Sequence, residues 1–247
     1  MVDIKFIHGD CLEEMPKLAD KSIDMILCDL PYGTTACKWD VLIPFEPLWK
    51  QYKRLIKDNG AIVLTASQPF TSALVMSNVA MFRHAWVWEK TRPANFMSAK
   101  YQPMKYHEDV LVFGKGKVTY YPVKTIGNKN HATKARHGKS NIYGLTENNV
   151  GIDTNEEKWP SSIIKIKSTD STQNFHPTQK PVALFEYLIR TYTNEGDTVL
   201  DNCAGSGTTG IAAWRQKRNA ILIEKDELYF NAAKERFYRE TRQVAMF

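Results

Sequence analysis

Four consecutive residues, Asp29-Leu30-Pro31-Tyr32, place an acid, a rigid turn and an aromatic ring directly after the apolar run 23–28. A short apolar run predicts a buried strand, so the tetrapeptide is expected at the carboxyl end of that strand. In open α/β sheets ligands bind at this edge, and a carboxylate there is placed for chemistry. Taken alone, the tetrapeptide also suits an ordinary turn, because proline fixes its own φ and keeps the preceding residue extended.

A glycine-rich segment in the C-terminal third predicts a nucleotide-type site. The apolar strand 198–201 runs into three glycines with the G-x-G-x-x-G spacing, Gly205, Gly207 and Gly210, which open a helical pattern. Without Cβ atoms, such a loop lets a ligand approach the backbone and the helix N-terminus. The next strand, 220–223, ends in Glu224, an acid that suits the two hydroxyls of a ribose. A nicotinamide oxidoreductase would carry the same features.

Asp201 separates these alternatives, because it stands at the strand end in front of the glycines. A carboxylate facing the ligand would repel a pyrophosphate, whereas an amino group and a positive sulfonium would be attracted to it. The charge pattern therefore fits S-adenosylmethionine better than NAD.

The chain resembles the amino-group DNA methyltransferases of the N6-adenine/N4-cytosine family, in the beta arrangement. Asp29-Leu30-Pro31-Tyr32 is similar to the family's catalytic Asp-Pro-Pro-Tyr, and residues 201–209 are similar to its cofactor loop, Asp-Pro-Phe-x-Gly-Ser-Gly-Thr-Thr. The segment 176–181 and the pair Gly9-Asp10 resemble two further family motifs that contribute to the cofactor pocket. The catalytic motif precedes the cofactor motif, as in the beta arrangement.

The resemblance implies an S-adenosylmethionine-dependent methyltransferase with a Rossmann-like α/β fold: a mostly parallel central sheet, helices on both faces and an irregular target-recognition insertion. The catalytic residues that it implies are Asp29, Pro31 and Tyr32. The residues that it implies for the cofactor are Asp10, Cys11, Asp29, Thr178, Lys180, Asp201, Asn202, Ala204, Gly205, Ser206, Gly207, Thr208, Thr209 and Glu224.

Two positions depart from the family pattern. Leu30 replaces the first proline of the tetrapeptide, which costs some rigidity but keeps the acid, the second proline and the aromatic ring. Asn202-Cys203 replaces Pro-Phe in the cofactor loop, which removes an aromatic ring that could line the cofactor site.

The reaction that we predict is methyl transfer to the exocyclic N6 of an adenine that has left the duplex. An Asp-led tetrapeptide is the family's usual adenine form, and cytosine-N4 members, which more often begin with Ser, are the near alternative. A DNA-binding subunit without turnover is a more remote alternative, against which the intact tetrapeptide argues. No Pro-Cys pair occurs in the sequence, which argues against methylation of cytosine carbon 5, since that reaction needs a thiolate.

Composition places the chain among soluble proteins of a reducing compartment. Its 247 residues, 43% of them hydrophobic, can bury the core of one large α/β domain. The four cysteines and six histidines show no metal-ligand spacing, so free thiols and no metal are expected. No targeting segment is recognisable, and no apolar run approaches the roughly 18 residues of a membrane helix. We therefore expect a cytoplasmic protein.

Alternating patterns predict the elements that position these motifs. The predicted strands are 4–8, 24–28, 61–65, 85–88, 110–113, 198–201 and 220–223, and the predicted helices are 48–57, 70–79, 182–192, 208–217 and 227–239. Asn59-Gly60 is expected to end the first of these helices.

Residues 115–175 break the alternation and are predicted to be an insertion within a single methyltransferase domain, 1–247. Between 115 and 140 there are seven Lys and Arg residues, interleaved with Tyr and His, and no acid. This composition suits double-stranded DNA as the partner, with a solvated loop as the plain alternative. The DNA-binding residues predicted here are Lys129, Lys134, Arg136 and Lys139.

The stretch 88–97 is predicted to be a polar loop that follows a strand, covers the active site and helps to hold DNA open. Lys90 and Arg92 are its expected DNA contacts, and Phe96-Met97 is its apolar tip. The alternative is that Phe96 and Met97 pack on the core. The resemblance leaves open a homodimer and a cognate restriction endonuclease as further partners.

Overall fold

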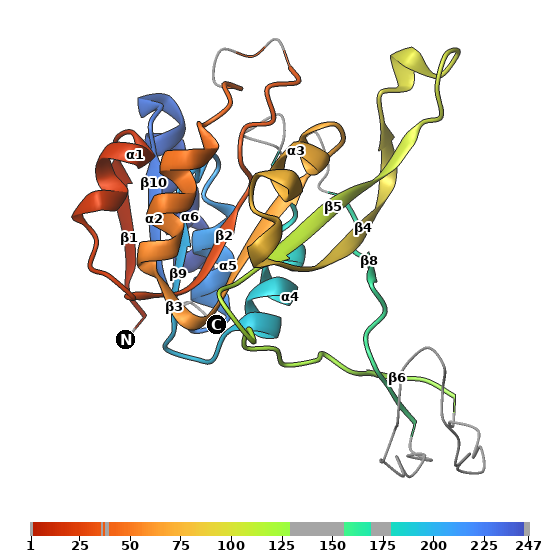
Figure 1. The fold of residues 1–247 in the computed structure, drawn as a ribbon. Helices are drawn as coiled ribbons and strands as arrows, with labels where there is room; N and C mark the ends of the chain where they lie inside the picture. Colours follow the sequence, from red (N-terminus) through yellow and green to blue (C-terminus); the bar gives the residue numbers. More distant parts are fainter. Residues whose placement is uncertain (1, 36, 38–39, 129–155, 169–178, 245–247) are drawn as a thin grey trace. The chain divides into compact units, whose positions relative to one another are not determined.

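The computed structural model describes residues 2–35, 37, 40–128, 156–168 and 179–244 (Figure 1). The chain divides into two compact units. The larger consists of Met1–Tyr121 and Ser162–Phe247, and the smaller is Pro122–Ser161. Each unit is described by itself.

The larger unit is built on an eight-stranded sheet in the order β1-β10-β9-β2-β3-β5-β4-β8. Neighbours from β1 to β3 are parallel, as are β4 and β8, whereas β5 is antiparallel to both β3 and β4. The strands are β1 (Ile4–His8), β2 (Ile23–Cys28), β3 (Ile56–Ala66), β4 (Phe82–Ala94), β5 (Lys105–Phe113), β8 (Ile163–Lys165), β9 (Thr198–Asp201) and β10 (Asn219–Glu224).

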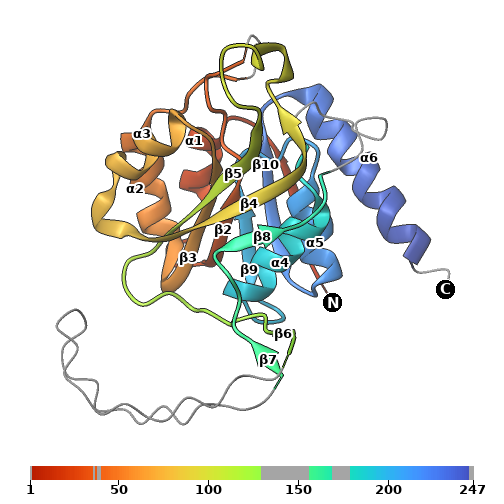
Figure 2. The same ribbon diagram turned by 90° about the vertical axis from the view of Figure 1, so that its right-hand side faces the viewer.

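Helices cover both faces of this sheet (Figure 2). One face carries α1 (Cys11–Glu14), α2 (Phe45–Leu55) and α3 (Phe70–Ser77), and the other carries α4 (Val182–Tyr192), α5 (Thr208–Arg215) and α6 (Glu227–Val244). Short 3-10 turns are η1 (Met15–Lys17), η2 (Val79–Met81) and η3 (Phe96–Ser98).

The alternation of side chains along β2 explains the two-faced core. Ile26 and Cys28 pack in the cluster that includes α2 and α3, while Met25 and Leu27 pack in the cluster that includes α4 and α5. Because successive side chains of a strand point to opposite faces, a strand with helices on both sides must be apolar throughout. All four of these side chains are fully buried.

The glycine loop between β9 and α5 depends on two glycines. Gly207, just before α5, has φ 72°, in the left-handed region that favours glycine. A Cβ at Gly210 would lie 2.5 Å from Leu222 Cδ1, so α5 can pack this closely on β10 only with glycine there. Gly207 thus allows the turn into α5, and Gly210 allows the close packing of α5 on β10.

The predicted α/β architecture is confirmed, and α4 and β9 have the predicted bounds. Two local predictions are wrong. Asn59-Gly60 does not end a helix: α2 ends at Leu55, and the pair lies inside β3, where the register with β2 shifts between Ile23 and Met25. The stretch 88–97 is not a loop either, because β4 continues to Ala94 and pairs with β5 as a hairpin.

The smaller unit contains the ribbon of β6 (Thr125–Ile126) and β7 (Glu157–Lys158). Lys124 forms an ion pair of 2.7 Å with Glu157 and lies 4.8 Å from the centre of the Trp159 ring. Within the predicted insertion, residues 115–121 and 162–168 belong to the larger unit. The predicted DNA contacts of the insertion, Lys129, Lys134, Arg136 and Lys139, and the predicted cofactor residue Thr178 lie outside the described residues.

Among the described residues, no helix is both long and apolar enough to cross a membrane. The same part of the chain holds no group of three or more His, Cys, Asp or Glu residues arranged for a metal ion. The four cysteines are unpaired.

Candidate active site

Four acids lie at the carboxyl ends of neighbouring parallel strands. Asp10 follows β1, Glu224 ends β10, Asp201 ends β9 and Asp29 follows β2. From β9 the chain moves to β10 on one side, and from β2 it moves to β3 on the other side. The order of the strands in the sheet therefore reverses between the parallel neighbours β9 and β2. Ligands of open α/β folds bind at such a switch point. The sequence motifs thus meet at the expected place.

Asp29 is held by three donors from three elements. Its Oδ1 accepts hydrogen bonds from the Tyr32 hydroxyl, over 2.9 Å, and from the Thr65 hydroxyl at the end of β3. Its Oδ2 accepts from Lys180 Nζ over 2.6 Å. A carboxylate oxygen can accept about two hydrogen bonds, so Oδ1 is saturated and Oδ2 keeps one acceptor position. The carboxylate is rigidly placed and can still take one hydrogen from a ligand.

Tyr32 belongs to this arrangement through both its ring and its hydroxyl. The ring stacks on Phe70 of α3 with 5.1 Å between ring centres and 23° between planes, and Lys180 Nζ lies 5.7 Å from its centre. Burial and the neighbouring Asp29 carboxylate raise the pKa of Tyr32 well above its ordinary value. The phenol therefore stays protonated and acts as a donor to Asp29.

Leu30, which stands where the family usually has a proline, is a core residue. Its side chain is 3% exposed and packs in the core cluster below α2 and α3. The position between Asp29 and Pro31 is thus used for packing, and Asp29 owes its rigidity to its three hydrogen-bond donors.

Asp201 holds the conformation of the glycine loop through hydrogen bonds. Its side chain is 3% exposed, and its two oxygens accept hydrogen bonds from the Cys203 backbone N–H, over 3.1 Å, and from the Thr209 hydroxyl. The sequence argument that this carboxylate faces the cofactor is wrong, because both oxygens are turned to donors of the loop itself. Asp201 supports the cofactor site by fixing the loop.

Burial raises the pKa of Asp201 to about 6. Because the folded state then binds the proton more tightly than the unfolded state, stability contributed by this proton is lost as pH rises from about 4 to 6. We expect the stability of the wild type, relative to Asp201→Asn, to fall by roughly 3 kcal/mol over that range. Urea unfolding of both proteins at several pH values measures this difference, and a constant difference would contradict the assignment.

Glu224 and Asp10 flank the other side of the loop. Glu224 Oε2 accepts from the Gly205 N–H over 2.7 Å, and Oε1 accepts from the Asp226 N–H over 2.9 Å, which leaves an acceptor position on each oxygen. Asp10 caps α1 through Leu12 and forms an ion pair of 3.0 Å with Lys225. Its burial acts to raise its pKa, but these hydrogen bonds hold the pKa of Asp10 below its ordinary value.

Most other predicted cofactor side chains are buried and engaged with the protein. Asn202 accepts a 2.6 Å hydrogen bond from the Tyr52 hydroxyl, and Arg236 of α6 donates to Ser206 and Thr208. Cys11, Ala204 and Thr209 are buried. These residues can act on a ligand only by shaping the loop or through the backbone. A Cβ added to Gly205 would have a single neighbour, Cys203 O at 4.0 Å, so space for a ligand is open there.

The charged side chains beside the glycine loop fit S-adenosylmethionine. Among the described residues, Glu224 forms no ion pair with a lysine or arginine, and its two oxygens accept from the backbone N–H groups of Gly205 and Asp226. An acid without a basic partner favours a cationic ligand over a pyrophosphate. Glu224 retains the acceptors that two ribose hydroxyls need.

Lys90 lies in a different environment from the one that was predicted for a DNA contact. Its side chain is only 15% exposed, and its ammonium pairs with Glu108 of β5 over 2.7 Å. The prediction placed Lys90 on a solvent-facing loop, but β4 carries it into the ion pairs next to Asp29. Arg92, farther along β4, is exposed.

Sequence reasoning missed Thr65, Glu108 and Asp40. Thr65 lies at the end of the predicted strand 61–65 and Glu108 just before the predicted strand 110–113, and their contacts with the Asp29 site depend on strand register. Asp40 accepts hydrogen bonds from the backbone N–H groups of Gly33, Thr34 and Thr35, which shapes the segment after Tyr32. An acid shortly after a turn was the only signal available for Asp40.

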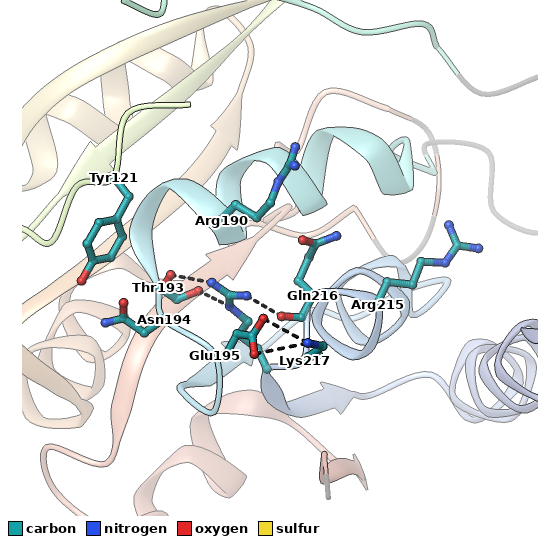
Figure 3. Close-up of a pocket in the computed structure, with 9 residues that line it drawn as sticks. Tyr121, Arg190, Thr193, Asn194, Glu195, Arg215, Gln216 and Lys217 are labelled. Atoms are coloured by element: carbon teal, nitrogen blue, oxygen red, sulfur yellow. Dashed lines mark hydrogen bonds and ion pairs between the residues drawn. The ribbon is translucent and has the colours of Figure 1, made fainter. Parts of the chain in front are cut away.

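A cavity of about 420 Å³ lies at the amino ends of the parallel strands, where β9 and β10 begin (Figure 3). Two of its basic side chains are paired within the lining: Arg218 donates to the Thr193 carbonyl over 2.7 Å, and Lys217 pairs with Glu195 over 3.3 Å. None of the acids at the carboxyl ends of the strands lines it. This cavity is therefore separate from the candidate active site.

Comparison with known families agrees with the geometry. Residues 23–235 match the family model of the N6/N4 methyltransferases, which is described as DNA methylase. The chain belongs to the DNA methylase family. The match includes Asp29, Lys180 and the glycine loop, so the family resemblance predicted from the motifs is confirmed.

Individual relatives are similar over most of their length. The type II methyltransferase M2.MboI of Moraxella bovis is 29% identical, with 95% of this chain and 87% of the relative covered. The DNA adenine methyltransferase YhdJ of Escherichia coli K12 is also 29% identical, with 90% and 79% covered.

Solved structures of DNA methyltransferases share the fold. The complex of M1.HpyAVI with S-adenosylmethionine has a TM-score of 0.63 and 26% identity, with 94% of this chain and 99% of that chain covered. The cytosine-N4-specific PvuII DNA methyltransferase has a TM-score of 0.67 at 18% identity, with 96% and 87% covered. The predicted Rossmann-like methyltransferase fold is thus confirmed.

Proposed function

We propose that this member of the DNA methylase family is a site-specific DNA methyltransferase that transfers a methyl group from S-adenosylmethionine to the N6 amino group of adenine. The observation that carries the proposal is Asp29, a carboxylate fixed by three donors, with one open acceptor position, beside the strand that bears the glycine loop. Such a group can orient an amine toward a donor bound at the adjacent strand ends.

Adenine is favoured over cytosine by the acid itself. The family's adenine enzymes usually begin the tetrapeptide with Asp, and the relative YhdJ is named an adenine methyltransferase. Cytosine N4 is the second candidate, since the family model covers both reactions. The fold shared with the cytosine-specific PvuII enzyme does not favour either base, because that similarity is one of architecture.

The residues around Asp29 perform the orientation that an exocyclic amine requires. The lone pair of such an amine is delocalised into the base, so the nitrogen is a poor nucleophile until hydrogen bonds draw it toward tetrahedral geometry. Asp29 Oδ2 accepts one amino hydrogen, and the Leu30 carbonyl after it accepts the other. The nitrogen gains positive charge as it is methylated, and the fixed carboxylate stabilises that charge.

The cofactor half of the cleft consists of the glycine loop, Glu224 and Asp10. Glu224 would hold the ribose hydroxyls, Asp10 the adenine end, and the backbone near Gly205 the rest of the molecule. When bound, S-adenosylmethionine supplies an electrophilic methyl group. Asp201 keeps the loop in shape through Cys203 and Thr209.

The β4–β5 hairpin supports double-stranded DNA as the substrate. Ala66 at the end of β3 pairs with Asp109, so the part of β5 before Asp109 extends past the edge where Asp29 lies (Figure 1). Asn95, with φ 56°, turns the chain at the tip. The tip exposes apolar side chains: Phe96 is 68% exposed, Met97 81% and Tyr101 89%. The alternative that Phe96 and Met97 pack on the core is wrong.

We expect Phe96→Ala with Met97→Ala to reduce transfer to duplex DNA about tenfold, because apolar side chains inserted beside a base stabilise its exit from the stack. The free energy of unfolding should stay unchanged, since both side chains are exposed. Methylation of duplex and single-stranded DNA with the same site measures the effect, which should be larger on the duplex.

Met76→Ala is the matched control, because Met76 is 74% exposed on α3 and is not part of the hairpin tip. Equal losses for Met76→Ala and the hairpin variant would contradict the role of the tip, as would equal losses on both DNA forms.

The proposal is tested by incubating the protein with duplex DNA and labelled S-adenosylmethionine, followed by digestion to nucleosides. Label in N6-methyladenine is expected. Label in N4-methylcytosine would sink the adenine assignment, and no label would sink the enzyme. A DNA substrate and four unpaired cysteines fit a cytoplasmic place of action. The homodimer and the restriction partner stay predictions of the resemblance.

A further inference from the structure

The ion pair between Asp29 and Lys180 is the first link of a longer chain of alternating charges. Lys180 Nζ lies 2.6 Å from Asp29 Oδ2 and 3.4 Å from Glu108 Oε2. Glu108 Oε1 lies 2.7 Å from Lys90 Nζ. The four side chains come from the end of β2, the segment before α4, β5 and β4. Segments far apart in the sequence thus meet in one polar cluster.

All four charges are largely removed from water. The side chain of Lys180 is 7% exposed, those of Glu108 and Lys90 are 14% and 15% exposed, and that of Asp29 is 22% exposed. Buried ions are tolerated only when their charges are paired. Two carboxylates and two ammonium groups give the cluster no net charge, so each member is needed for the balance.

The position of Glu108 affects the contact between Lys180 and Asp29. Its Oε2 is buried and has no hydrogen-bond partner, although it lies 3.4 Å from the Lys180 ammonium. The ammonium therefore stands between two carboxylates, with its short hydrogen bond to Asp29 and an ion pair to Glu108 on the other side. Without the Glu108 charge, nothing of opposite sign would draw Lys180 away from Asp29.

We propose that Glu108 is a positioning residue of the methyl-transfer reaction, which acts through Lys180 to keep the charge and the open acceptor position of Asp29 available to the target amine. The Lys90 ammonium pairs with the other oxygen of Glu108 and balances its charge. The inference rests on the proposed function, because the amine is the ligand for which Asp29 is prepared. Nothing in the tetrapeptide motif or the glycine loop contains Glu108 or Lys90.

The chemistry explains why the balance matters. During transfer, positive charge moves onto the amino nitrogen beside Asp29, and nearby excess positive charge opposes this. Glu108→Gln keeps the size of the side chain but leaves the cluster with one positive charge in excess. Lys180 is then held by Asp29 alone and competes with the amine for the carboxylate.

Single-turnover methylation of a DNA duplex by the full-length protein tests the proposal. We expect Glu108→Gln to slow transfer at saturating cofactor by about tenfold or more, while the cofactor dissociation constant measured by calorimetry changes less than threefold. The double variant Glu108→Gln with Lys90→Met restores the charge balance and should transfer faster than Glu108→Gln alone. Rescue by removing a second charged group separates electrostatic positioning from structural support, for which losses would add.

The matched control is the pair Asp24 and Lys57, joined by an ion pair of 2.6 Å at the beginning of β2 and β3. Asp24→Asn is expected to leave the rate within twofold of the wild type. A wild-type rate for Glu108→Gln, or a double variant slower than both single variants, would overturn the proposal.

A readout without turnover separates this inference from the proposed function. The loss in the urea midpoint of the double variant should be smaller than the sum of the two single losses, because the remaining charges are balanced again. Additive losses would overturn the coupling. A wild type that transfers no methyl group would overturn the proposed function, and the midpoints would still decide whether Glu108 and Lys90 act as one unit.

Discussion

Replacing Asp29 with asparagine is expected to slow methyl transfer by on the order of 10²–10³-fold, because the reaction loses a preorganised negative charge at the nitrogen that becomes positive. Asparagine has nearly the same shape, and its oxygen can still accept from Tyr32 or Thr65. Lys180 keeps its ion pair with Glu108. Because the buried cluster then carries one positive charge in excess, the urea midpoint of this variant is measured beside its rate. Rates under single-turnover conditions and cofactor affinity by calorimetry measure the two effects separately.

Alanine at the same position is a less informative change. Both variants leave the buried ammonium of Lys180 with Glu108 as its only carboxylate, but Asp29→Ala also removes the acceptor of Tyr32 and Thr65, and a broken buried pair costs about 3–5 kcal/mol. A lost rate in that variant could come from unfolding. If Asp29→Asn lost cofactor affinity as well as rate, the assignment of Asp29 to the target base would be contradicted.

Glu224→Ala should have the complementary effect, a loss of cofactor affinity of roughly 10²–10⁴-fold. Two hydrogen bonds from ribose hydroxyls to a carboxylate are each worth about 1.5–3 kcal/mol. The variant also removes the acceptor of the Gly205 N–H, which holds the glycine loop against β10. Calorimetric titration with S-adenosylmethionine measures the loss, and transfer at saturating cofactor should recover much of the wild-type rate.

Glu235→Ala is a matched control, because Glu235 is an exposed acid in α6, the helix that follows β10. It should bind the cofactor as the wild type does. Unchanged affinity in Glu224→Ala, or an equal loss in Glu235→Ala, would move the cofactor away from β10.

The sequence predicted the elements that carry a strong local pattern. The bounds of α4 and β9 follow from apolar periodicity, and the glycines before α5 mark a turn that few other residues can adopt. Acids that follow short apolar strands predicted the edge of the sheet where Asp10, Asp29 and Glu224 meet. These features are local, so one stretch of sequence is enough to recognise them.

Features that depend on pairing between distant strands could not be predicted. Glu108 reaches Lys180 because β5 runs antiparallel to β3, and Lys90 reaches Glu108 because β4 continues past Trp88 instead of ending there. The polar stretch 88–97 was interpreted as a loop that follows a strand, although pairing with β5 makes it part of a hairpin. The orientation of Asp201 likewise depends on donors that only the folded loop supplies.

Sequencing that detects modified bases, in DNA from a host that expresses the wild-type protein or Asp29→Asn, tests the central claim most directly. The wild type should produce N6-methyladenine at one position of a single short sequence motif throughout the genome, and Asp29→Asn should produce none above background. The same modification in both hosts, or N4-methylcytosine with the wild type, would contradict the account of this cleft as an adenine-methylating site organised around Asp29.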